Sequence, residues 1–265
     1  MHTPDTAART ILNHLSPLPP MRVAVAETVG CVLAEPVVSR IAVPHWDNSA
    51  MDGYALRTAD LEAGRRDFTI TETIPAGDFP QRVVESGQCA RIFTGAPVPD
   101  GADCVIRQED VTARGDSVHI DDTRDAGRNI RQRGEDIAEG DEVFAAGTAV
   151  TPARLGVLVS LAHDPVTVHR RPRVAILTSG DEIADLDERD EILAGRKVAT
   201  SNTYTLTALI AAAGAEVTNL GIARDDPDDV KRRLESARDA DLIVTSAGIS
   251  VGDHDHLHEV LDALD

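Results

Sequence analysis

Three segments of the sequence combine hydroxyl, glycine and carboxylate residues in a way that could bind an anion together with a metal ion. Their polar residues are Ser179, Gly180, Glu182, Asp225, Asp226, Ser246, Gly248, Ser250 and Asp255. Backbone amides and hydroxyls in such loops suit a phosphate or another oxyanion. Carboxylates beside them need a cation, and a divalent ion of the Mg²⁺ type would satisfy both groups. Taken alone, each segment could also be an ordinary solvated turn.

Two further stretches are hard to explain by folding alone. Residues 44–55 contain the only Trp, one of the two Tyr and two Asp, and residues 127–136 contain three arginines beside an acidic pair. Arginines at this density can bind phosphate or another oxyanion with two hydrogen bonds. A surface stripe of salt bridges is the alternative, and the residues alone do not decide between the two.

The three segments, residues 178–182, 221–226 and 245–255, each follow a predicted β-strand. After Pro172 the sequence alternates buried-strand runs at 174–177, 217–220 and 242–244 with helical runs, one capped by Asn202 and ending at Gly214, the other at 227–238. This alternation predicts a parallel sheet with right-handed crossovers. Ligands of such sheets collect beyond the carboxyl ends of the strands, so we expect the three segments to lie close together.

The rest of the chain has a different organisation. Helical spacing predicts one helix over residues 7–15, a less regular second helical stretch over 23–33 and a third helix from Thr151 towards His163. From about residue 44 to 136, short alternating runs at 68–71, 90–93 and 117–120 predict a β-rich part. We therefore expect a helical linker domain (1–44 and 137–170), a β-rich domain (45–136) and an α/β domain (171–265), an α/β plus β multi-domain fold.

Composition excludes several classes of protein. The chain has 265 residues and a net charge of −19, which argues against nonspecific binding to nucleic acid or anionic lipid. Aspartates outnumber glutamates 30 to 15 and only two of 26 basic residues are lysines, a pattern typical of a surface adapted to high salt, with an acidic docking face as the alternative. The three cysteines lie far apart, and neither a long apolar run nor a signal peptide is present. We expect a soluble protein of the reducing cytoplasm, with buried structural cysteines.

The string from Asp47 to Ala55 resembles the Asp-Asn-Ser-Ala-Met-Asp-Gly-Tyr-Ala signature of the molybdopterin molybdenumtransferases. These are the bacterial and archaeal MoeA proteins, which are related to the C-terminal part of gephyrin. Five more blocks resemble that family in its order, at residues 92–103, 129–136, 179–182, 225–227 and 250–255. The resemblance covers essentially the whole chain.

The resemblance implies insertion of molybdate into adenylylated molybdopterin with release of AMP. It also implies Mg²⁺ or another divalent cation and a homodimer, in which the β-rich domain of one subunit faces the molybdopterin-binding α/β domain of the other. Nucleic acid and membrane are not expected as partners. Arginines, glycine-loop amides and a carboxylate-bound ion are what an acidic protein needs to hold two negative substrates.

The resemblance also implies a role for each matching position. Catalytic positions match Asp52, Asp136, Glu182 and Asp255. Metal ligands match Glu182, Asp225, Asp226 and Asp255. Substrate-binding positions match Asn48, Ser49, Thr94, Arg131, Ser179, Gly180, Ser246, Gly248 and Ser250. The carboxylates would position metal and substrate, while Arg131 and Thr94 would contact anions.

The sequence departs from the family at two places. Ala247 stands where the family usually has glycine, and alanine adopts positive φ less readily, so we expect this loop to be slightly displaced. Family members also continue through a Lys-Pro-Gly-Lys type segment and a small β-domain that would follow Asp265. We therefore expect the α/β domain to be incomplete at its C-terminus here, and molybdate insertion to be at least ~10-fold slower than in a longer chain.

Other interpretations of the same residues stay open. A binding or scaffold module that keeps the pterin site without completing the reaction is the main alternative, and a protein that adenylylates molybdopterin is a weaker one, because such proteins lack the block at 47–55. His254, His256 and His258 could bind zinc, but alternate residues do not share a helical face, so solvated histidines are the favoured interpretation.

Overall fold

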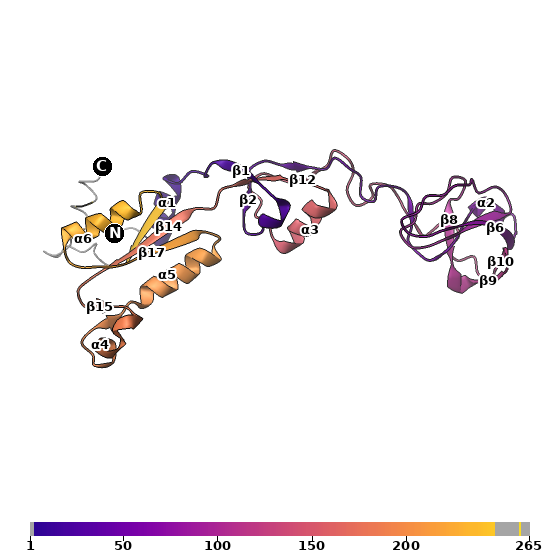
Figure 1. Cartoon of the computed structure of the whole chain (residues 1–265). Helices are drawn as coiled ribbons and strands as arrows, with labels where there is room; N and C mark the ends of the chain where they lie inside the picture. Colours follow the sequence, from indigo (N-terminus) through magenta and orange to yellow (C-terminus); the bar gives the residue numbers. More distant parts are fainter. Residues whose placement is uncertain (1–2, 247–259, 261–265) are drawn as a thin grey trace. The chain divides into compact units, whose positions relative to one another are not determined.

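The computed structural model describes residues 3–246 and Val260, and the chain divides into two compact units. Unit 1 combines residues 1–35 with 146–265, and unit 2 is the continuous segment 36–145. The chain therefore leaves unit 1 once, forms unit 2 and returns (Figure 1). Each unit has its own sheets and its own buried residues. The finer division into three domains stays a prediction.

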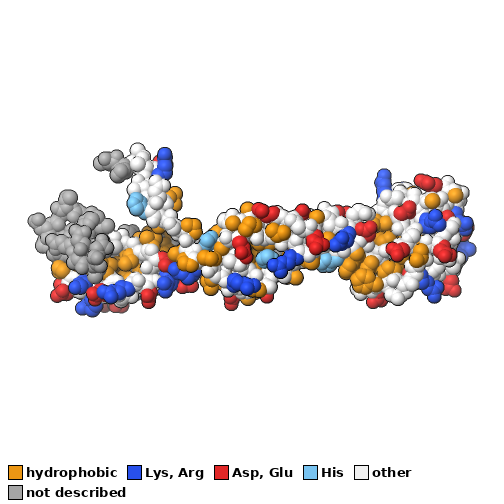
Figure 2. Space-filling model, turned by 90° about the horizontal axis from the view of Figure 1, so that it is seen from above, with side chains coloured by type: hydrophobic (Ala, Val, Ile, Leu, Met, Phe, Trp, Pro, Cys, Tyr) orange, Lys and Arg blue, Asp and Glu red, His pale blue; other side chains and the backbone are white. Residues whose placement is uncertain are grey.

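Charged side chains of both signs are interspersed on the surface of the protein. On the face drawn in Figure 2, Asp and Glu are scattered among Lys and Arg and do not gather in one acidic patch. Some form exposed ion pairs, such as Arg196 with Glu191 at 2.6 Å and Arg133 with Glu139 at 3.5 Å. The acidic surplus is thus a property of the surface rather than of one docking area on this face.

A six-stranded sheet forms the centre of unit 2. In sheet order its strands are β8 (Cys104–Arg107), β5 (Gly53–Leu56), β7 (Gln88–Ile92), β6 (Asp67–Ile74), β10 (Ser117–Ile120) and β9 (Val111–Arg114). Neighbouring strands are antiparallel except β6 and β7, which are parallel. The short helix α2 (Thr58–Glu62) follows β5, and a 3₁₀ turn, η2 (Gln108–Asp110), follows β8. The predicted β-rich character of this part is confirmed.

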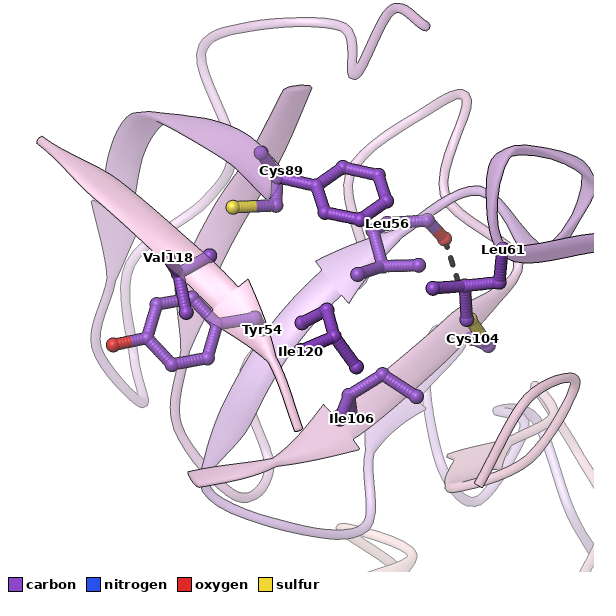
Figure 3. Packing of buried hydrophobic residues seen from close by; sticks show 9 residues of the cluster. Tyr54, Leu56, Leu61, Cys89, Cys104, Ile106, Val118 and Ile120 are labelled. Carbon is purple, nitrogen blue, oxygen red and sulfur yellow. Dashed lines mark hydrogen bonds between the residues drawn. The ribbon is translucent and has the colours of Figure 1, made fainter. Parts of the chain in front are cut away.

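Alternation along these strands places apolar side chains in two buried clusters, one of them around Ala55 and Ile92 and the other drawn in Figure 3. Phe68, Leu56 and Ile106 are buried there together with Cys89 and Cys104. Burial raises the pKa of the Cys89 thiol to about 12, so this thiol is not a nucleophile at neutral pH. Because Cys31 is also buried, the prediction of three structural core cysteines is confirmed.

Two short ribbons complete unit 2. β4 (Asn48–Ser49) pairs with β11 (Ile130–Arg131), and β3 (Val37–Val38) pairs with β12 (Glu142–Phe144). In the first ribbon Asn48 lies opposite Arg131. The ribbon therefore brings the two stretches that stood out in the sequence, 44–55 and 127–136, side by side.

The N-terminal part of unit 1 is a small sheet with two helices. Its described strands are β1 (Pro20–Val23), β13 (Val166–His169) and β2 (Val32–Leu33), and its helices are α1 (Pro4–Asn13) and α3 (Pro152–Ser160). The predicted helix over residues 23–33 was wrong: the chain forms β1, a 3₁₀ turn η1 (Val25–Glu27) and β2 instead. β-branched valines favour strands here, and both strands pair with β13, which is far away in the sequence.

The parallel sheet of unit 1 confirms the alternation of strands and helices. β14 (Arg173–Ser179) lies between β17 (Glu216–Ala223) and β18 (Leu242–Ser246), and both pairings are parallel. Helix α6 (Pro227–Ser236) packs Val230 and Leu234 against Leu177. Helix α5 (Ser201–Ala212) contacts the next residue of β14, Thr178, through a hydroxyl hydrogen bond. Successive strand residues point to opposite faces, so α5 and α6 cover opposite faces of this sheet (Figure 1).

A small excursion separates β14 from α5. It consists of β15 (Ile183–Ala184), the 3₁₀ turn η3 (Leu186–Glu188), helix α4 (Arg189–Leu193) and β16 (Val198–Ala199). β15 and β16 pair in parallel. The excursion returns the chain to the carboxyl end of β14, where α5 begins.

Candidate functional site

The predicted site residues fall on both units. Unit 2 contains Asn48, Ser49, Asp52, Thr94, Arg131 and Asp136. Unit 1 contains Ser179, Gly180, Glu182, Asp225, Asp226 and Ser246. Gly248, Ser250 and Asp255 lie outside the described residues, as do His254, His256, His258 and Ala247.

Asp52 and Thr94 form a direct pair in unit 2. The Thr94 backbone N–H and hydroxyl both donate to Asp52 Oδ1, each at 2.8 Å. These two bonds, helped by the charge of Arg91, hold the pKa of Asp52 below its usual value against the opposing effect of burial. The carboxylate is therefore ionised at neutral pH, with Oδ1 bound to Thr94. The partly exposed pair can bind a polar ligand.

The sharp bend before Asp52 is built by Ser49. Its hydroxyl donates to the Met51 carbonyl at 2.5 Å and accepts from the Met51 N–H at 3.2 Å. Ser49 is fully buried, so its side chain shapes the loop that presents Asp52. A direct contact of Ser49 with substrate stays a prediction, which would require this turn to open.

The neighbouring Asn48 is also buried, at 7% exposure. Its Oδ1 atom has no hydrogen-bond partner among the described residues. Leaving a buried acceptor unpaired costs about 1–3 kcal/mol, which is unusual for a purely structural residue. The observation is compatible with the predicted role of Asn48 at the site.

Arg131 and Asp136 follow on the opposite strand of the ribbon and beyond it. Both side chains are exposed, and Arg131 is held by its backbone pairing with Asn48. The neighbouring Arg133 has a different role, because its backbone N–H donates to Asp47 Oδ1 at 2.7 Å and its Nε to the His45 carbonyl at 3.1 Å. Arg133 thus holds residues 45–47 in place through hydrogen bonds, while Arg131 presents its guanidinium to solvent.

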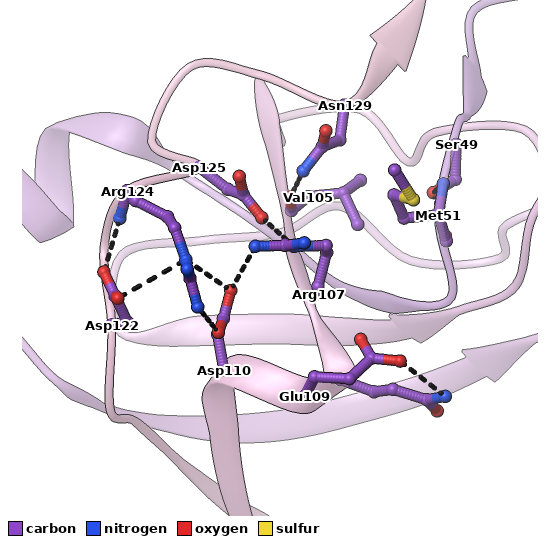
Figure 4. A network of polar contacts seen from close by, with 11 residues as sticks. Ser49, Met51, Val105, Arg107, Glu109, Asp110, Asp122, Arg124, Asp125 and Asn129 are labelled. Carbon is purple, nitrogen blue, oxygen red and sulfur yellow. Dashed lines mark hydrogen bonds and ion pairs between the residues drawn. The ribbon is translucent and has the colours of Figure 1, made fainter.

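An ion-pair network holds the loop that leads to Arg131 (Figure 4). Arg107 binds Asp125 at 2.8 Å and Asp110 at 3.0 Å, and Arg124 binds the same Asp110. The Asp110 side chain is only 5% exposed. Asp110 of η2 pairs with Arg124, and Arg107 pairs with Asp125. Because Arg124 and Asp125 lie in the loop between β10 and β11, these ion pairs hold that loop and the start of β11.

The second cluster lies in unit 1 at the carboxyl ends of β14 and β18. A pocket of about 180 Å³ is lined by Thr178, Ile183, Val198, Ala199, Thr200, Ser201, Asn202 and Ser246. Asn202 Nδ2 donates to Ser246 Oγ at 3.1 Å across this pocket. Of the described site residues that the sequence predicts, Ser246 alone lines this pocket, whereas Ser179, Gly180, Glu182, Asp225 and Asp226 do not. The convergence of all three segments stays a prediction.

Asn202 was expected to cap α5, and the structure corrects this. The N-cap residue is Thr200, whose hydroxyl binds Thr203 Oγ1 at 2.6 Å and makes no capping bond. Asn202 is the second residue of α5 and donates from its side-chain amide to Ser246. Sequence reasoning therefore missed Asn202, Thr200 and Ser201 as pocket residues. The signal for them was their position, at the start of a helix that follows a strand end.

Gly180 and Glu182 form a tight turn next to this pocket. Gly180 has φ +133°, and a side-chain Cβ at this position would lie 2.7 Å from Glu182 Oε2. The positive φ is what favours glycine here, because the exposed Glu182 side chain is flexible and could move away. Ser179, at the end of β14, is half-buried, and Glu182 is exposed.

The two aspartates after β17 have separate roles. Asp226 is the N-cap of α6 and accepts from the Asp228 N–H at 3.1 Å, whereas Asp225 is exposed. Within residues 3–246 and Val260, no three His, Cys, Asp or Glu side chains lie close enough to hold a metal ion. The described residues thus offer oxygen ligands that suit Mg²⁺ in kind, but they do not form a metal site by themselves.

None of the described helices is long and apolar enough to cross a membrane.

Two sequence families match the chain. The MoeA N-terminal region (domain I and II) matches residues 2–162, and a probable molybdopterin binding domain matches residues 175–264. The second match contains the parallel sheet and its pocket, and the first contains the Asp52 and Thr94 pair.

Curated relatives and solved structures agree with these matches. A molybdopterin molybdenumtransferase of Nostoc sp. is 38% identical over 89% of this chain and 54% of its own length. One of Staphylococcus aureus is 31% identical over 97% of this chain and 62% of its own length. The chain therefore spans about half to three fifths of these relatives.

A crystal structure of the molybdopterin biosynthesis MoeA protein of Pyrococcus horikoshii superposes with a TM-score of 0.80 at 30% identity, covering 89% of this chain and 64% of that one. Since the first sequence family matches more than half of its residues, the chain belongs to the family of the MoeA N-terminal region (domain I and II).

Proposed function

We propose that the chain acts in molybdenum cofactor biosynthesis, inserting molybdate into adenylylated molybdopterin with release of AMP. The observation that carries this proposal is the pocket at the carboxyl ends of β14 and β18, where hydroxyl and amide groups stand beside apolar side chains, inside the part that matches a probable molybdopterin binding domain. The hydroxyls of Ser201 and Ser246 and the amide of Asn202 can donate to phosphate or to a pterin edge.

The residues of unit 2 suit the binding of molybdate, the second substrate of the proposed reaction. Molybdate is a tetrahedral oxyanion, and an exposed guanidinium such as that of Arg131 binds such an anion. Asp52 is ionised and oriented by Thr94, so it can accept a hydrogen bond from substrate and orient it. We assign Asp52, Thr94 and Arg131 to substrate positioning, and Asp136 stays a proposed catalytic neighbour.

A divalent cation belongs to the proposal as a bound ion that would neutralise phosphate and molybdate oxygens. Glu182 would hold it together with Asp255, which lies outside the described residues, and with Asp225. The positioning roles proposed for Asp52, Thr94 and Arg131 do not depend on the ion.

We further propose a homodimer in the cytoplasm. Helix α1 buries none of its side chains, and its Ile11 and Leu12 are 60% and 66% exposed, which supports association with a second copy. Cys31, Cys89 and Cys104 are free and buried, as expected in a reducing compartment. Sedimentation at several concentrations would detect the dimer.

The test of the function is a single-turnover assay with the chain, adenylylated molybdopterin and molybdate. We expect AMP release together with cofactor formation, and we expect Asp52→Asn to slow both at least ~10-fold, because the amide removes the charge that Thr94 orients. Asp78→Asn, at an exposed aspartate of the same unit, is the matched control and should be unchanged.

The assay also separates the enzyme from the scaffold alternative. Binding of adenylylated molybdopterin without AMP release would contradict the proposed reaction and favour a binding module. Equal rates for the native chain and Asp52→Asn would remove Asp52 from the site.

A further inference from the structure

Arg91 is a half-buried residue of β7 that none of the site assignments includes. Its guanidinium lies against two aromatic rings, with Cζ 5.1 Å from the centroid of the Tyr54 ring and 4.6 Å from that of Phe93. A cation over two rings is attracted by both, and the planar guanidinium stacks on them. The rings therefore hold the Arg91 head group in one orientation.

The two terminal nitrogens of Arg91 reach Gly53, which follows Asp52 in the chain, and Gln108, which lies on the neighbouring segment. Nη1 donates to the Gly53 carbonyl at 2.9 Å, and Nη2 donates to Gln108 Oε1 at 2.6 Å. The Gln108 backbone N–H in turn donates to the Asp52 carbonyl at 3.0 Å. Arg91 thus fixes one peptide that follows Asp52 and one residue that binds the Asp52 backbone.

The strand order explains why one residue can do this. Gly53 lies opposite Ile92 of β7 on one side and opposite Arg107 of β8 on the other. A Cβ at Gly53 would lie 2.0 Å from the Ile106 carbonyl oxygen, so β5 and β8 approach too closely for any other residue. Three residues after Arg91 the chain reaches Thr94, which binds the Asp52 carboxylate.

We propose that Arg91 is a positioning residue for the Asp52–Thr94 pair, acting through Gly53 and Gln108 and not through contact with substrate. The expected effect of Arg91 on turnover rests on the proposed function, whereas the contacts that it makes all lie within unit 2. Arginine suits this role better than lysine, because two separate nitrogens of one planar group reach the two acceptors, whereas the donors of lysine all sit on a single nitrogen. The positive charge of Arg91 also favours the ionised form of Asp52.

The structural arm of the test measures amide hydrogen exchange in the 265-residue chain. Arg91→Met should accelerate exchange at the Thr94 and Gln108 amides about 10-fold or more, since both donate to Asp52. The Ile120 amide, which donates to the Arg66 carbonyl in the same unit, should keep its protection. Arg82→Met, at an exposed arginine of unit 2, is the control variant.

A merely stabilising role would accelerate all three amides together, and that result would overturn the proposal. Unchanged exchange at Thr94 and Gln108 would overturn it as well. If Arg91→Met does not fold, Gln108→Ala removes one of the two partners and should accelerate exchange at the Thr94 amide relative to Ile120, with no such effect overturning the proposal.

The kinetic arm compares kcat and KM for cofactor formation. Arg91→Met should lower kcat about 10-fold with KM changed less than about 2-fold, and Arg91→Lys should recover part of the loss. A rise in KM with unchanged kcat would show that Arg91 binds substrate directly and overturn its positioning role. If the native chain forms no cofactor, the proposed function fails, while the exchange data still decide the role of Arg91.

Discussion

Asp241 shows how completely one carboxylate can be used to hold elements together. Arg170 binds it with two parallel bonds of 2.7 and 2.8 Å, and the Arg173 backbone N–H donates to it at 2.7 Å. These bonds connect the end of β13, the start of β14 and the residue before β18. The Arg170 side chain, followed by the Arg173 N–H, lowers the pKa of Asp241 far below its usual value.

This lowered pKa predicts a pH-dependent contribution to stability. Because the folded-state pKa lies below the unfolded-state value of about 3.9, the contribution is complete above that value and decreases as pH falls towards the folded-state pKa. Asp241→Asn should therefore lower the unfolding temperature at pH 7 and at pH 5 by the same amount, and by less at pH 3.5. Thermal unfolding of both proteins at the three pH values measures this. A difference that grows towards acid would contradict the assignment.

Other residues at this scale show what a sequence pattern cannot reveal. Ser49 matches a substrate-binding position, but its hydroxyl forms its hydrogen bonds with the Met51 backbone. Asn202 looks like a cap, but its amide reaches Ser246, 44 residues later. In both cases residue type and position along the chain were readable, whereas the direction of the side chain depends on which segment lies opposite.

At the scale of elements, hydrophobic periodicity was sufficient where the apolar run is long enough to show its period. The strands β14, β17 and β18 and the helices α3, α5 and α6 lie where the sequence pattern predicts them. β1 and β2 were taken for a helix, and β15, α4 and β16 were not foreseen. The strands among these are only two to four residues long, so they show no period, and their pairing register is contained in no window of sequence.

The junction of β14 with α5 is held by a buried chain of hydroxyls. Thr203 Oγ1 lies 2.6 Å from both Thr178 Oγ1 and Thr200 Oγ1, and all three residues are at most 5% exposed. Because Thr178 and Thr200 also line the pocket, these hydrogen-bonded hydroxyls set the position of the start of α5 relative to the end of β14. The geometry of the candidate pocket thus depends on hydrogen bonds between three uncharged threonine side chains.

We expect Thr203→Val to destabilise the protein by about 1–3 kcal/mol, because it leaves two buried hydroxyls without their partner. Replacing Thr178, Thr200 and Thr203 together by valine should recover a large part of that loss, since no polar group then remains unpaired. Urea unfolding of the two variants and the native chain provides the comparison. A triple variant less stable than the single one would show that the hydroxyls do more than satisfy one another.

At the scale of the whole molecule, net charge and ion pairing act in opposite directions as salt is added. The chain carries 45 acidic and 26 basic residues, and the excess repels itself when it is unscreened. Exposed pairs such as Arg133 with Glu139 weaken in salt but contribute little. The network around Asp110 is screened less, because that side chain is 5% exposed.

The repulsion should therefore dominate, and the unfolding temperature should rise between 0.05 M and 2 M KCl, most steeply below about 0.5 M where the screening length changes most. A variant with the exposed Glu62, Asp78 and Asp116 changed to amides carries three charges fewer and should gain less from the same salt. This comparison separates screening of surface charge from general effects of salt on hydrophobic burial, which both proteins share. A midpoint that stays level or falls with KCl would contradict the interpretation of the acidic surface as an adaptation to high salt.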